Sequence, residues 1–180
     1  MVQRLTSDDR LCDLGPGSPQ QAQRDILSQL DVDALFADCE IGDRDMARCC
    51  LAALWMRHDF LDESHTISQS VESASGSYWH GIMHRREADY SNAKYWFRRV
   101  GEHEIFPELC RAALELARKH SLNRNTQFLF EQTKWQPAAF VDLCQAVAGR
   151  RSEAECLAQE IAHAEWQLLF DCCYQRAVQD

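Results

Sequence analysis

Two histidine patterns are the features of this 180-residue chain best suited to chemistry. His80, His84 and Glu87 recur with the spacing i, i+4, i+7, so on one helix they fall within an arc of about 60°. Two imidazoles four residues apart can reach one metal ion, and the carboxylate lies one turn further along. The pattern therefore predicts a metal site on one helix face. The zinc-protease signature with two histidines at this spacing is absent, because the residue after His80 is Gly81 rather than glutamate.

A second pattern with the same spacing precedes the first, and it consists of His58, Asp62 and His65. We expect helices over residues 58–73 and 78–87 to pack antiparallel across the Ser/Gly turn between them. The two ligand-bearing faces would then meet. Such a site would combine imidazole and carboxylate donors, which suit zinc, iron or manganese rather than a thiolate-bound metal.

The predicted site contains ligands and groups that act on a substrate. The expected metal ligands are His65, His80, His84 and Asp62. Glu63 and Glu87 are the expected general bases, and Glu63 is also the first choice among carboxylate ligands. The expected cofactor is one divalent transition metal: zinc, iron or manganese. An open coordination position would activate water or dioxygen, so hydrolysis and oxidation of a small substrate both remain open.

Arginine and aromatic side chains crowd the same stretch of sequence. Arginine suits bidentate contact with phosphate or carboxylate, so we expect an anionic small-molecule substrate. The expected substrate-binding residues are Arg85, Arg98, Trp79 and Tyr95. The alternative is that these arginines form ion pairs with some of the 28 acidic residues. For Glu165, beside the apolar stripe of the last helix, we expect a salt bridge to Arg86, Arg98 or Arg99.

The block from Gly76 to Pro107 resembles one tetratricopeptide-type repeat. The resemblance depends on Gly81, the turn 88–90, Ala93, Phe97 and Val100. It implies a local pair of antiparallel helices, of the kind that binds protein segments in that family. Ala88 replaces the usual turn glycine, His80 takes a position that leucine normally holds, and no second copy follows at the 34-residue period. The resemblance nevertheless gives an alternative function, which is a helical interaction module without catalytic activity.

The same region is also similar to a group of uncharacterised bacterial and fungal proteins. Three stretches carry this similarity: DESHTISQ at residues 62–69, SYWHGIMHRRE at 77–87 and DYSNAKYWFRRVG at 89–101. No activity is assigned to that group, so the similarity adds no function.

The elements that must position these residues are helices. The chain has only 7 Gly and 4 Pro, about half the average usage, and few of the β-branched residues that strands prefer. We therefore predict an all-α fold of about seven helices, as an irregular bundle or an α-hairpin array. Residues 1–17 are expected to be an irregular lead-in, and residues 18–180 a single helical domain. Besides a short turn of helix at 31–37 and a segment at 58–73 that is either a helix or a bent continuation of the one before it, the expected helices cover residues 19–30, 44–57, 78–87, 92–100, 107–119, 137–148 and 153–177.

Composition argues against several other classes. The net charge of −9 argues against a general nucleic-acid binder, and no apolar run approaches the length of a membrane span. The N-terminus lacks the apolar stretch of a signal peptide. The nine cysteines are an odd number without an export signal, so we expect reduced thiols in a cytoplasmic protein. The apolar cysteine stripes leave a homo-oligomer open.

Overall fold

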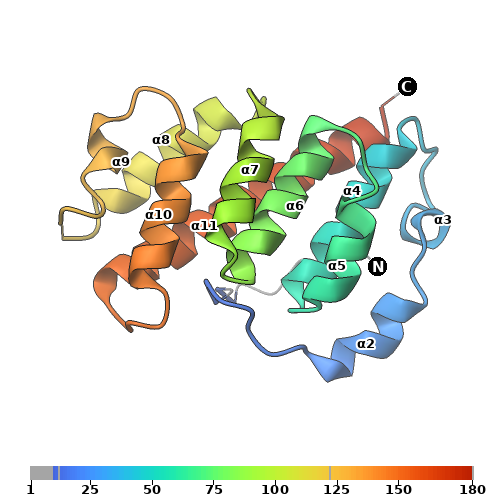
Figure 1. The fold of residues 1–180 in the computed structure, drawn as a ribbon. Helices are drawn as coiled ribbons and strands as arrows, with labels where there is room; N and C mark the ends of the chain where they lie inside the picture. The colour runs from blue at the N-terminus through green and yellow to red at the C-terminus, as the bar shows by residue number, and fades with distance from the viewer. Residues whose placement is uncertain (1–9, 12, 122, 180) are drawn as a thin grey trace.

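Helices form all the regular structure in the computed structural model, which describes residues 10–11, 13–121 and 123–179 (Figure 1). The all-α prediction is confirmed, with ten helices in the described residues where about seven were expected. They are α2 (Gln21–Ser28), α3 (Val32–Leu35), α4 (Arg44–Arg57), α5 (Leu61–Ser68), α6 (Ala74–Arg86), α7 (Tyr90–Val100), α8 (Phe106–Ala117), α9 (Phe128–Glu131), α10 (Pro137–Val147) and α11 (Glu153–Ala177). The first nine residues and residue 12 of the expected lead-in lie outside this description, and residues 13–20 contain no helix.

Three helices begin within one residue of their predicted start, and each has a side-chain cap. Asp31, Asp43 and Ser152 each accept hydrogen bonds from backbone amides in the first turn of α3, α4 and α11. The expected turn at residues 73–77 is wrong, because Ser73 accepts a bond from the Gly76 amide and caps α6 four residues earlier than predicted. The helix that presents His80 and His84 is consequently longer at its N-terminal end.

The expected helix over residues 58–73 is also wrong, since it is shorter at both ends. The preceding helix, α4, ends at Arg57, and Asp59 adopts a left-handed backbone conformation with φ of 64°. The buried Asp59 carboxylate accepts hydrogen bonds from Arg86 at 2.6 Å and from Arg10 at 3.2 Å, which holds the chain in this break. His58 is therefore separated from α5, and the spacing from His58 to His65 does not lie on one helix.

The central helix of the fold is α6, which packs against α4, α5 and α7. Figure 1 shows α10, α7, α6 and the α4–α5 pair side by side, with the long α11 running behind them. From Ser75 to Arg86 every residue of α6 is buried, as expected for a helix surrounded by neighbours. Gly81 allows the closest approach to α7, because a Cβ atom there would lie 3.3 Å from the Phe97 ring. None of the described helices has both the length and the apolar character that crossing a bilayer requires.

Candidate metal centre

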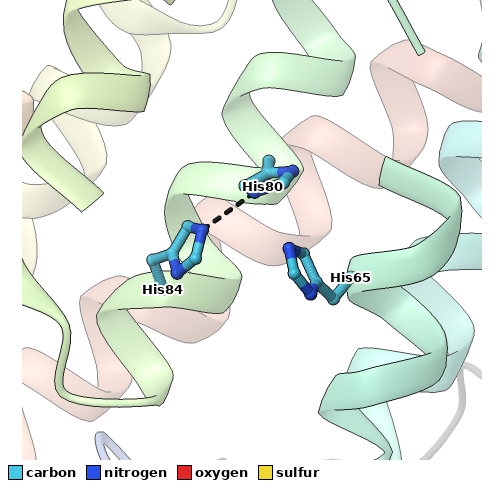
Figure 2. Close-up of side chains that lie close together, drawn as sticks. All are labelled: His65, His80 and His84. Carbon is cyan, nitrogen blue, oxygen red and sulfur yellow. Dashed lines mark hydrogen bonds between the residues drawn. The ribbon is translucent and has the colours of Figure 1, made fainter. Parts of the chain in front are cut away.

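Three histidines from two helices converge where α5 packs against α6. The shorter helix provides His65, and α6 provides His80 and His84 one turn apart (Figure 2). One ligand nitrogen from each ring lies within 4.8 Å of the other two. Nε2 of His80 is 2.8 Å from Nε2 of His84, and the His65 ring meets both other rings nearly edge-on. Within the described part of the chain, no carboxylate joins these three imidazoles.

The antiparallel pairing of α6 with α7 covers both histidines of α6. Trp96 stacks on the His80 ring, with centroids 4.0 Å apart and planes inclined by 29°. One turn earlier on α7, the Asn92 side-chain amide lies 3.0 Å from Nε2 of His84. Residues four apart share a helix face, so Asn92 and Trp96 on α7 both face α6. Asn92 lies opposite His84, and Trp96 lies opposite His80. The helix α7 thus contributes a wall of the site.

Burial keeps the central imidazoles neutral. His80 is 2% exposed, and burial together with the neighbouring His84 and His65 lowers its pKa to about 3. Burial also lowers the pKa of His84, although the carboxylate of Glu87 opposes this shift. Neutral imidazole is the form that binds a metal. In the described residues no group forms a hydrogen bond with Nδ1 of His80.

Glu87 orients the second histidine from outside the cluster. Its carboxylate lies 3.3 Å from Nδ1 of His84, at the C-terminal end of α6. A carboxylate on the far nitrogen of a histidine fixes the ring tautomer and directs Nε2 toward a metal. Glu87 therefore contacts a histidine of the cluster and is not itself one of the grouped ligand atoms.

The other predicted carboxylates lie along a neighbouring cavity of about 380 Å³. Asp62, Glu63 and Glu87 all line it, and Glu63 forms an ion pair with Arg24 at 2.8 Å. Asp62 is exposed and does not join the three imidazoles. The structure therefore brings the expected acids together along this cavity, whose described lining includes none of the three histidines, and places none of them as a fourth ligand.

The four expected substrate-binding residues do not share one surface. Trp79 is fully buried, and Arg85 is buried in an ion pair with Glu165. Arg98 and Tyr95 are exposed on α7. The expected partners of Glu165 are wrong, because it pairs with Arg85 and also accepts a hydrogen bond from the Tyr78 hydroxyl at 3.0 Å. Arg86 instead pairs with Asp59.

Asn92 is the neighbour of the cluster that sequence reasoning missed. Its position could have been found from spacing, because residues 92 and 96 repeat the four-residue interval of residues 80 and 84 across a short turn. A helix hairpin places such pairs opposite each other. Asparagine is common outside functional sites, so its type alone carried no signal.

The fold and this cluster define a helical protein with a three-histidine cluster in which two of the rings are buried. Comparison with protein-family models, with curated proteins and with solved structures found no match to this chain.

Proposed function

We propose that this protein binds one divalent transition metal through His65, His80 and His84. The observation that carries the proposal is the convergence of three imidazole nitrogens within 4.8 Å, with two of the rings buried. Buried polar groups normally find partners, yet the contact between the two Nε2 atoms uses only one proton. One metal ion would bind a lone pair from each of the three imidazole nitrogens, which accounts for the convergence of these nitrogens.

The donor set favours zinc and metal-assisted hydrolysis. Three neutral imidazoles leave the full charge of a divalent ion uncompensated and a coordination position open. Such a zinc ion lowers the pKa of bound water to about 7 and so supplies hydroxide near neutral pH. Oxidation of a substrate at non-haem iron typically uses two histidines and a carboxylate, and no carboxylate joins the described cluster. We therefore favour hydrolysis of a small substrate. Glu87, which contacts His84, also lines the cavity that contains Glu63.

Elemental analysis of tag-free protein, as purified and after reconstitution with zinc, tests the proposal. We expect about one equivalent of metal in the wild type and less than about a tenth in His80→Ala, His84→Ala and His65→Ala. His120→Ala is the matched control, because His120 lies on another part of the fold and pairs with Glu160 at 3.0 Å. Less than about a tenth of an equivalent in the reconstituted wild type would contradict the proposal.

A helical interaction module is the second candidate function. The observation that favours it is the packing of α4, α5, α6 and α7 in chain order, each against the next. Helices stacked in this way form surfaces for protein segments in repeat proteins. Metal analysis separates the two candidates, because an interaction module has no need of a stoichiometric metal.

We also propose a reducing, cytoplasmic setting. The eight cysteines in the described residues are all free thiols, and several of them are buried. Free buried thiols are typical of proteins kept under reducing conditions. Thiol titration of freshly purified, denatured protein should find all nine thiols of the chain, and a lower count would contradict this setting.

A further inference from the structure

Asn92 has an unusual position relative to His84. Its side-chain nitrogen lies 3.0 Å from Nε2 and 3.4 Å from Nδ1 of the same ring. These two ring nitrogens flank a single carbon, and an atom so close to both would collide with that carbon if it lay in the ring plane. The amide therefore lies over the face of the imidazole, and the in-plane position of Nε2 is left to the contact with Nε2 of His80.

This position places the amide beside the open side of a bound metal. A metal ion would lie about 2 Å from Nε2, in the plane of the ring. From the two distances given above, the Asn92 nitrogen would then be about 4 Å from the ion, which is too far for coordination. It is the right separation for a hydrogen bond to an oxygen atom that the metal holds. Trp96 covers the His80 ring, so α7 offers one polar group and one aromatic wall to the centre.

We propose, on the basis of the proposed metal centre, that Asn92 orients the exchangeable ligand of the metal. The amide N–H of Asn92 donates a hydrogen bond to an oxygen of the metal-bound molecule. The amide is half-buried and its nitrogen, which can only donate, faces the ring nitrogens of His84. The centre accordingly selects ligands that coordinate through an oxygen able to accept a hydrogen bond. Carboxylates and carbonyl compounds form the substrate class that fits.

The cobalt-substituted protein tests this role through its visible absorption, without the need for a known substrate. Acetate and thiocyanate are the two probes. Both bind divalent cobalt, but thiocyanate coordinates through nitrogen and presents no oxygen. We expect Asn92→Leu to weaken acetate binding about tenfold, which is the effect of one lost hydrogen bond to a charged group. Thiocyanate binding should change by less than about twofold. Asn92→Gln should recover part of the acetate affinity.

Controls separate this role from a structural one. Asn92→Ala is measured in parallel in case Asn92→Leu does not fold, and Gln167→Leu, which alters an exposed amide on α11, should leave both affinities unchanged. Unchanged acetate binding, or equal loss of acetate and thiocyanate binding, would overturn the role of Asn92 while the metal centre stands. Loss of cobalt itself in both Asn92 variants would make Asn92 a direct ligand and also overturn the orienting role. Failure of the wild type to bind cobalt would overturn the metal centre and this role together.

Discussion

The Nε2 atoms of His80 and His84 lie 2.8 Å apart on successive turns of a buried helix. At this separation one neutral ring donates its proton to the lone pair of the other. Tetrahedral zinc would hold the two nitrogens about 3.3 Å apart, which requires ring movements of only about 0.5 Å. The two nitrogens of α6 can therefore bind a metal in place of the shared proton with little movement of their own rings.

Zinc should stabilise the folded protein. A ligand that binds only the folded state, at a free concentration of 100 times its dissociation constant, raises the free energy of unfolding by about 2.7 kcal/mol. We expect this increase in the wild type and in His120→Ala, measured by chemical denaturation with and without zinc. His80→Ala and His84→Ala should show no increase. An equal increase in all four proteins would place the metal elsewhere.

Glu87 should contribute to metal affinity although it is not a ligand. Its carboxylate contacts Nδ1 of His84 at 3.3 Å, and loss of such a supporting group typically weakens metal binding by about 10- to 100-fold. We expect Glu87→Ala to show a loss in this range in competition titrations with a chromophoric chelator. Asp62→Asn, which alters an exposed carboxylate outside the cluster, should change affinity by less than about twofold. A larger loss for Asp62→Asn than for Glu87→Ala would restore Asp62 as a ligand.

The ion pair of Arg85 and Glu165 should act on stability. Both side chains are almost completely buried, and removal of one partner leaves an uncompensated charge that costs about 3–5 kcal/mol. We expect Glu165→Leu to lower the free energy of unfolding by this amount. The double variant with Arg85→Met should recover much of the loss, because no unpaired charge remains. Urea denaturation measures both.

The exposed pair of Arg111 and Glu115 is the control for that measurement. Exposed pairs contribute about 0–1 kcal/mol, so Arg111→Ala should change stability only slightly. If Glu165→Leu were as mild as Arg111→Ala, the buried pair would not be a structural element. Arg85 would then be available for the substrate contact that its residue type suggests.

His103 should make stability depend on pH. Burial is the chief cause that lowers its pKa from the ordinary value, and its ring contacts the Ser75 hydroxyl at 3.1 Å. Below the unfolded pKa of about 6.5, the unfolded chain binds a proton that folded His103 does not. The free energy of unfolding therefore falls as pH falls, by up to about 1.4 kcal/mol per pH unit.

The variant His103→Gln removes this titration. We expect its unfolding free energy to fall less steeply than that of the wild type below about pH 6.5, and to run parallel to it above that pH. Urea denaturation of both proteins across this range measures the two slopes. His80 and His84 are present in both proteins, so the difference between the slopes belongs to residue 103. Equal slopes would show that His103 titrates alike in the folded and unfolded chains.

Local features of the sequence were sufficient for the helical class and for half of the histidine centre. The scarcity of glycine and proline argues against sheets, and the helices capped by Asp43 and Ser152 begin at the predicted residues, 44 and 153. His80 and His84 share a face because the helical repeat determines the angle between residues four apart. These properties depend on neighbours in the chain, so they can be predicted without the fold.

Tertiary structure decided which groups complete the site. The break at Asp59 separates His58 from His65, and it is held by Arg86 from a distant helix. The register between α6 and α7 brings Asn92 over His84. Helix ends and the register between helices depend on buried ion pairs and close packing between segments far apart in the chain. Periodicity within one segment does not depend on those contacts. For that reason the sequence could predict the meeting of His65 with His80 and His84, but not the separation of His58 or the place of Asn92.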